Sequence, residues 1–133
     1  IIIMMYELYF DGGANPNPGR AGAGAVVYKN NEEILCTSHF VGINQTNNEA
    51  EYTGLIKGFE LALKNEIYDL TVKGDSQLVI KQMKGEYKVK AENLKILYLK
   101  AKELEGKFSS IIYLHVKRDF NKRADQLATT GME

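Results

Sequence analysis

Residues 45–65 read QTNNEAEYTGLIKGFELALKN, and the pattern predicts a long helix that begins near Thr46. Thr46 and Glu49 have the spacing of a capping box, in which two side chains bond the first free backbone N–H groups of a helix. Glu51 borders the face that the pattern buries. It is either an early acid that complements the helix dipole, or one member of a site whose other members lie elsewhere. The buried face consists of apolar residues three or four positions apart: Tyr52, Leu55, Ile56, Phe59 and Leu63.

Three strands are predicted before this helix. Residues 4–11 alternate between apolar and other side chains, and Asp11 ends the run. Residues 23–29 and 32–41 form two further strands, joined by an Asn-Asn turn. The stretch between the first two strands, GGANPNPGRAG at 12–22, is rich in glycine and proline and predicts a loop.

The segments after the helix alternate between strands and helices. Because a strand that returns through a helix can pair in parallel, we expect the later strands to extend the sheet in parallel. The chain is therefore predicted to be one α/β domain spanning 1–133. Its mixed five-stranded sheet has three antiparallel strands and then two parallel strands, and helices flank it. The later elements are a strand at 69–74, a helix at 76–84 capped by Ser76 or Asp75, a helix at 91–106, a strand at 109–118 and a helix at 121–131.

The composition indicates a soluble globular protein, since 44% of the 133 residues are hydrophobic and 26% are charged. The 17 basic and 17 acidic residues give a net charge of zero, which argues weakly against binding to nucleic acid through bulk charge. A single cysteine, Cys36, favours a reduced intracellular setting, and we expect a cytoplasmic monomer. No apolar run is long enough to span a membrane.

Four acids stand where the predicted elements meet. Asp11 ends the first strand, Asp75 ends the fourth, Glu51 lies in the helix between them, and Asp125 follows Asn121 by one turn in the last helix. Sites in open α/β sheets form at strand ends, so these side chains are expected to converge. Four close carboxylates repel one another, and a hard divalent cation such as Mg²⁺ or Mn²⁺ removes that repulsion. Two such ions about 3.5–4 Å apart can clamp the attacking and leaving oxygens of a phosphodiester.

Each acid also has an ordinary explanation. Asp11 precedes two glycines and is a common turn residue, while Asp75 is a good helix cap. Asp125 could pair with Lys122 or Arg123 on the surface. Taken singly, no acid decides between the two explanations, whereas the four together favour a site.

Four segments resemble the type 1 ribonuclease H family, in the compact form found in archaea and many bacteria. They are YFDGGANPNPGRAGAG at 9–24, QTNNEAEYTGLIKGFELA at 45–62, VKGDSQLVIKQM at 72–83 and RDFNKRADQLA at 118–128. The resemblance implies that the four acids bind metal, with Asp11 shared between two ions, and that Glu51 also contacts a 2′-hydroxyl. It implies hydrolysis of the RNA strand of an RNA–DNA hybrid, leaving 5′-phosphate and 3′-hydroxyl ends.

The same resemblance implies a set of substrate contacts. Amide side chains suit them, because they offer donors and acceptors to 2′-hydroxyls and base edges. Glycine in the first loop would let backbone approach the nucleic acid closely. The expected substrate-binding residues are Gly12, Gly13, Asn17, Thr46, Asn47, Asn48, Gln77 and Asn121.

Two departures from the family pattern are visible. Many members carry a catalytic histidine in a loop before the last helix, but here the loop is short and His115 falls in a predicted strand. Arg118 is therefore the expected auxiliary catalytic group, and His115 is expected to be structural. The basic, tryptophan-rich segment that grips the hybrid in some members is absent or reduced to the lysines around Tyr87. Weaker binding with a stronger salt dependence would follow.

Two other functions remain open at this point. A non-catalytic nucleic-acid-binding module of the same fold would fit the zero net charge, although four acids facing phosphates would gain it nothing. A DNA-directed nuclease would use a similar acid cluster. Binding without cleavage would identify the first, and cleavage of DNA-only substrates the second.

Overall fold

The computed structural model describes residues 5–133, so Met4 and the rest of the predicted lead-in to the first strand lie outside the described residues. The order of elements is the one predicted, with a short 3₁₀ turn at Arg118–Phe120 added before the last helix. The strands are β1 (Tyr6–Asn15), β2 (Gly19–Lys29), β3 (Glu32–Gln45), β4 (Asp69–Gly74) and β5 (Ser110–His115). The helices are α1 (Asn47–Lys64), α2 (Gln77–Met83), α3 (Glu92–Glu105) and α4 (Lys122–Met132).

The five strands form one mixed sheet in the order β3-β2-β1-β4-β5. β1 and β3 run antiparallel to β2, whereas β4 pairs in parallel with both β1 and β5. The predicted sheet is therefore confirmed. Its register matters for function, because Phe10 lies opposite Gly74 in the last pair of β1 with β4. Asp11 and Asp75 each follow that pair directly, and so they lie side by side where the pairing of β1 with β4 ends.

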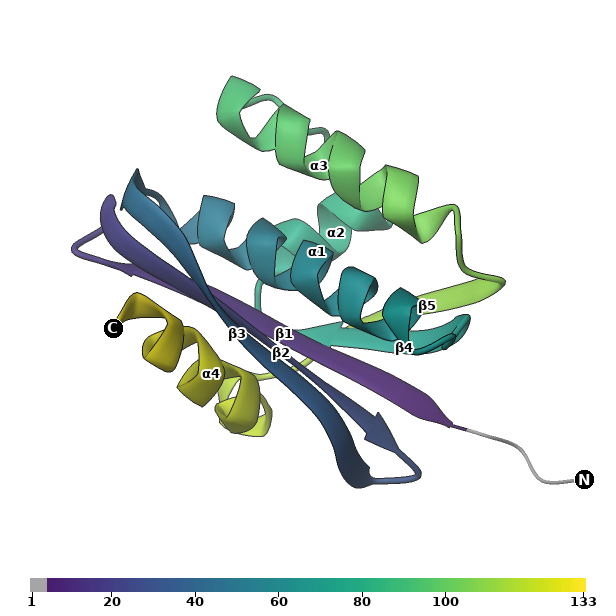
Figure 1. Cartoon of the computed structure of the whole chain (residues 1–133). Helices are drawn as coiled ribbons and strands as arrows, with labels where there is room; N and C mark the ends of the chain where they lie inside the picture. Colours follow the sequence, from purple (N-terminus) through teal and green to yellow (C-terminus); the bar gives the residue numbers. More distant parts are fainter. Residues whose placement is uncertain (1–4) are drawn as a thin grey trace, which may run out of the picture.

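Helices cover both faces of the sheet (Figure 1). α1, α2 and α3 lie on one face, and α4 lies on the other, against β1, β2 and β3. The main core lies under α1, where Leu8, Phe10 and Phe59 are fully buried. A smaller cluster under α4 includes Val26 and Leu127. Within residues 5–133, no helix is long and apolar enough to cross a membrane.

The prediction of a loop at 12–22 was wrong. β1 runs on to Asn15 and β2 begins at Gly19, so the turn itself is confined to 16–18. The small residues in this stretch serve close packing instead. A Cβ at Gly22 would lie 2.2 Å from the Ala128 carbonyl oxygen in α4, a separation that real atoms do not adopt. Glycine is a common turn signal, but in this stretch it allows helix backbones to approach both faces of the hairpin.

The start of α1 has the predicted capping box. The Thr46 Oγ1 accepts a hydrogen bond from the Glu49 N–H at 3.1 Å, and the Glu49 Oε1 accepts one from the Thr46 N–H at 2.8 Å. At α2, the Ser76 Oγ accepts from the Val79 N–H at 3.2 Å, so Ser76 is the cap of that helix. Both caps begin helices beside the ends of β1 and β4, and they fix the direction in which those helices leave the sheet.

Replacing the cap of α1 should therefore destabilise the whole domain. Thr46→Ala is expected to lower the free energy of unfolding by about 1 kcal/mol, because two backbone donors lose their arrangement. Urea denaturation measures the change. The matched control is Thr130→Ala on the exposed face of α4, which should shift stability by less than about 0.5 kcal/mol. Equal effects in the two variants would contradict the capping role.

Candidate active site

Three carboxylates from separate elements meet at one end of the sheet. Asp11 comes from β1, Glu51 from the first turns of α1, and Asp75 from the residue after β4. One oxygen of each lies within 4.8 Å of one oxygen of the other two. Asp11 is 5% exposed and Glu51 9% exposed, while Asp75 is half-buried. The ordinary explanations for Asp11 and Glu51, a turn residue and a dipole-complementing acid, do not account for buried carboxylates in mutual contact.

The three acids line a cavity of about 680 Å³. Asp125, on α4, lines the same cavity but is not part of the compact group of three. The cavity therefore collects all four acids that the sequence singled out. Other predicted residues that line it are Gly12, Gly13, Asn47, Asn48 and Arg118.

Glycine brings α1 close enough to β1 for Glu51 to reach Asp11. A Cβ at Gly12 would lie 2.1 Å from the Ala50 carbonyl carbon, and one at Gly54 would lie 2.4 Å from the Asp11 carbonyl oxygen. Neither backbone could approach so closely with a larger residue at those positions. The two glycines thus set the distance between the acids, which is a reason for Gly12 besides the expected approach of nucleic acid.

Burial and mutual repulsion make these acids reluctant to ionise. Burial, reinforced by the charge of Asp75, raises the pKa of Asp11 to about 7, although the hydrogen bond with Glu51 opposes the rise. The pKa of Glu51 is raised well above its usual value, first by burial and then by the charge of Asp11. Burial also raises the pKa of Asp75, against the opposing effects of the Asn121 side chain and the Arg118 charge. A proton or a cation must therefore offset the negative charge of this cluster.

The donor set fits a hard divalent cation. The Glu51 Oε2 is buried and, among the described residues, has no hydrogen-bond partner. An unpartnered carboxylate oxygen beside two further carboxylates is costly unless a cation binds it. Oxygen donors of this kind are the ligands that Mg²⁺ and Mn²⁺ prefer. Asp11, Glu51 and Asp75 are the residues that could hold such an ion.

Asn17 and Asn47 connect the β1–β2 turn to the start of α1. The Asn17 Oδ1 accepts a hydrogen bond from the Asn47 N–H at 3.0 Å, and the Asn47 Oδ1 accepts one from the Ala14 N–H at 2.7 Å. Both residues are exposed, and so is Asn48 beside them. These bonds use the oxygen of each amide, and within residues 5–133 they leave its NH₂ group available to face a substrate.

Two further predicted contacts lie outside the open part of the cavity. Gln77 is exposed at the first position of α2 and does not line the cavity. Asn121 is 1% exposed, and its Nδ2 donates to the Phe10 carbonyl oxygen at 2.9 Å. Asn121 thus joins α4 to β1 at the residue before Asp11, and in this structure its side chain is closed to a duplex.

Arg118 and His115 both line the cavity near Asp75. His115 lies in a strand, as predicted, but it is the last residue of β5, which ends before the predicted 118. Its Nε2 is 3.2 Å from the Asp75 carbonyl oxygen. It is nevertheless exposed, so its ring faces the site rather than a core. Its place in a strand had suggested a structural residue, but the last residue of a strand at this end of the sheet reaches the cavity.

Several residues on the cavity wall were not predicted from the sequence. Thr129 and Met132 lie on α4, four and seven positions after Asp125, and therefore on the same helical face. That spacing was a usable signal. Lys117 also lines the cavity, and no pattern distinguished it from the other lysines of the chain.

The connection between α2 and α3 is short, and within the described chain no additional helix stands there. Its lysines surround Tyr87, with the Lys81 ammonium 4.9 Å from the centre of the Tyr87 ring. The Gln82 Nε2 donates to the Lys88 carbonyl oxygen at 3.4 Å, and the Tyr52 hydroxyl donates to the Gln82 Oε1 at 2.5 Å. The compact form without a basic protrusion is thus confirmed, and the remaining loop is tied to the core through Gln82.

Comparison with known proteins agrees with this architecture. A family model described as reverse transcriptase-like matches residues 9–131. The bifunctional protein Rv2228c of Mycobacterium tuberculosis is 43% identical over 124 residues, which are 92% of this chain and 34% of that protein. The chain therefore spans about a third of the length of this relative.

Two solved structures are similar over almost the full length of both chains. The RNase H1 of Halobacterium salinarum has a TM-score of 0.92 at 35% identity, covering 96% of this chain and 97% of that one. LC11-RNase H1, solved in complex with an RNA/DNA hybrid, has a TM-score of 0.89 at 33% identity, covering 96% of each chain. With the fold, the four acids and these likenesses in agreement, the chain belongs to the type 1 ribonuclease H family.

Proposed function

We propose that this chain is an endoribonuclease that hydrolyses the RNA strand of RNA–DNA hybrids and leaves 5′-phosphate and 3′-hydroxyl ends. The convergence of Asp11, Glu51 and Asp75 in one cavity carries the proposal. The hybrid bound to LC11-RNase H1 supports the choice of substrate. We further propose that the chain acts as a monomer in the cytoplasm, where its single Cys36 stays reduced.

We propose that two Mg²⁺ or Mn²⁺ ions bind together with the substrate, held by Asp11, Glu51, Asp75 and Asp125. When bound, such a pair supplies a water of lowered pKa and stabilises charge on the leaving oxygen. The protein's part is to hold the four carboxylates in place before the substrate arrives. Burial fixes Asp11 and Glu51, and the Asn121 bond to the Phe10 carbonyl fixes the backbone next to Asp11.

Substrate recognition follows from the groups at the cavity mouth. The free amide NH₂ groups of Asn17 and Asn47 and the side chain of Asn48 can donate to phosphate oxygens and 2′-hydroxyls. Glu51 can accept a hydrogen bond from a 2′-hydroxyl, the group that separates RNA from DNA at a site. Gly12 and Gly13 line the cavity, where their backbone can approach the strand. Gln77 would contact the strand only if the duplex extends past α2.

Cleavage of matched duplexes tests this function. End-labelled RNA–DNA hybrid, RNA–RNA and DNA–DNA of one sequence are incubated with the protein in EDTA, Mg²⁺ or Mn²⁺. Metal-dependent cutting of only the RNA strand of the hybrid is expected. Hybrid binding without cutting in any metal would favour a binding module instead, and cutting of the DNA duplex would favour a DNA-directed nuclease.

Substitutions of Arg118 and His115 distinguish which of the two residues assists catalysis. Arg118→Ala is expected to lower the cleavage rate about tenfold, since a fixed cation beside Asp75 can hold a phosphate oxygen. Arg118→Lys should recover part of the rate. His115→Ala is expected to change the rate less than threefold, a difference of roughly 0.6 kcal/mol or less. Steady-state cleavage measures all three variants, and a larger loss in His115→Ala would reverse the assignment.

A further inference from the structure

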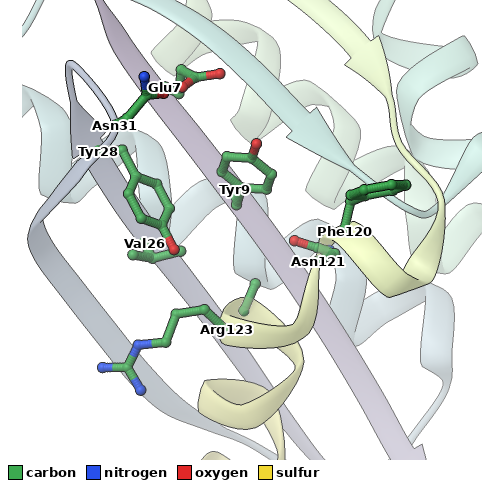
Figure 2. Close-up of a pocket in the computed structure, with 9 residues that line it drawn as sticks. Glu7, Tyr9, Val26, Tyr28, Asn31, Phe120, Asn121 and Arg123 are labelled. Atoms are coloured by element: carbon green, nitrogen blue, oxygen red, sulfur yellow. The ribbon is translucent and has the colours of Figure 1, made fainter.

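A second cavity lies on the face of the sheet that α4 covers, beside the start of that helix (Figure 2). It measures about 180 Å³ and is separate from the acid cluster. We call it the rear cavity. It is bounded by Glu7, Tyr9, Tyr28, Phe120, Asn121 and Arg123.

Asn121 places an unpaired acceptor at the rear cavity. Its Nδ2 donates to the Phe10 carbonyl oxygen, which can only accept, and this fixes the orientation of the amide. The opposite atom, Oδ1, is buried without a hydrogen-bond partner among the described residues. Figure 2 shows this oxygen directed toward the side of the cavity that Tyr9 and Val26 form. A buried acceptor left unpaired destabilises the protein, so a donor in the cavity would bind there favourably.

The charged groups at the rear cavity are already neutralised. Glu7 pairs with Lys73, and Arg123 pairs with Glu33 through two contacts of 2.9 and 3.1 Å. A net charge on an occupant would therefore meet no free counter-charge among these pairs. A neutral occupant is favoured.

Aromatic rings form much of the wall. Tyr9 and Tyr28 pack edge to face with ring centres 5.4 Å apart, and Phe120 is 71% exposed at the margin. Rings of this kind stack on planar ligands. A closed cavity of about 150 Å³ accommodates benzene, so the rear cavity has the size for one ring with small substituents.

We propose that the rear cavity binds a neutral, single-ring heterocycle with an N–H donor, such as a pyrimidine base, and that the donor bonds the Asn121 Oδ1. The base could come from a free nucleoside or from an unpaired position in a strand, since both present the same ring. Asn121 also contacts the Phe10 carbonyl next to Asp11. Asn121 therefore connects the wall of the rear cavity to the backbone beside the acid cluster.

A titration of the ¹⁵N-labelled full chain in EDTA tests the proposal, because no cleavage is needed. Uracil is expected to shift the Asn121 side-chain NH₂ signal and the backbone signals of Tyr9, Tyr28 and Phe120, with a millimolar dissociation constant. 1,3-Dimethyluracil, which lacks the N–H donors, should bind at least about tenfold more weakly. Uridine and a uridine trinucleotide then distinguish a free nucleoside from an unpaired base in a strand.

Phe120→Ala keeps the test independent of folding, since its side chain is mostly exposed. It should weaken uracil binding about fivefold through loss of stacking. The control Ile96→Ala removes an equally exposed apolar side chain on α3 and should leave binding unchanged. Equal binding of the dimethyl analogue, shifts centred on the acid cluster, or no saturable shift would each overturn the proposal. The last result would mean that the rear cavity holds only water.

Discussion

Asp11→Asn should reduce hybrid cleavage by at least about 10³-fold, a loss of roughly 4 kcal/mol in transition-state stabilisation. Asp11 is one of three acids with oxygens within 4.8 Å of one another, and both Glu51 and Asp75 alter its pKa. The amide keeps the size of the side chain but loses the negative charge that a divalent cation requires. The fold should persist, because the substitution removes a buried charge rather than a packing contact.

The matched control is Asp119→Asn. Asp119 is an exposed acid in the 3₁₀ turn before α4, and it does not line the acid cavity. The cleavage rate of this variant should stay within twofold of the rate of the unmodified protein, a difference of roughly 0.4 kcal/mol. Initial rates on one labelled hybrid in Mg²⁺ and in Mn²⁺ measure both variants. Unimpaired cutting by a folded Asp11→Asn protein would remove Asp11 from the site and the proposed function with it.

The sequence predicted the element order because each helix and strand carries its own periodic pattern. Thr46 and Glu49 are the first and last residues of one four-residue motif, so their bonds could be predicted without tertiary information. The parallel pairing of β4 followed from the helix that precedes it. Local rules of this kind hold wherever the partners are close in sequence.

The extent of β1 could not be predicted by the same rules. Gly12 and Gly22 look like turn residues when only neighbours along the chain are considered. In the fold, they allow α1 and α4 to pack on the two faces of the β1–β2 hairpin. Asp11 therefore lies inside a long strand and ends only its pairing with β4. Contacts between distant segments decided the structure here.

The sequence was enough to predict which acids belong to the cluster, but not how close to one another they lie. Position at strand ends suggested that Asp11 and Asp75 would meet, and the structure brings Glu51 to the same point. Whether Asp125 stands with them depends on how α4 sits on β1 and β2, which the sequence does not specify. The buried position of Asn121 had no signal either, because its partner, the Phe10 carbonyl, belongs to the backbone.

The metal-free protein should lose stability as the pH rises from about 4 to above 7. The pKa of Asp11 is raised from 3.8 to about 7 by burial, so between these values the folded state binds a proton that the unfolded state has released. Stability therefore falls with rising pH across this window, and the loss is complete above the folded pKa. A shift of this size corresponds to roughly 2–4 kcal/mol, as an order of magnitude for a group coupled to Glu51.

Asp11→Asn isolates this effect from every other titrating group. At about pH 3, below the unfolded pKa of 3.8, the variant and the unmodified protein should have nearly equal stability, because Asp11 is then mostly protonated in both the folded and the unfolded state. At pH 8 in EDTA, the variant should be more stable by about 2–4 kcal/mol in urea denaturation. Asp119→Asn, which replaces an exposed acid, should show no such pH-dependent gain.

Added Mg²⁺ should restore the stability that the unmodified protein loses at pH 8. A ligand that binds only the folded state stabilises it in proportion to the logarithm of the ligand concentration. The same addition should do little for Asp11→Asn, whose site lacks one carboxylate. The cluster therefore opposes folding when empty and supports it when a cation is bound. A metal-free variant no more stable than the unmodified protein at pH 8 would mean that the three acids are already neutralised by some other group.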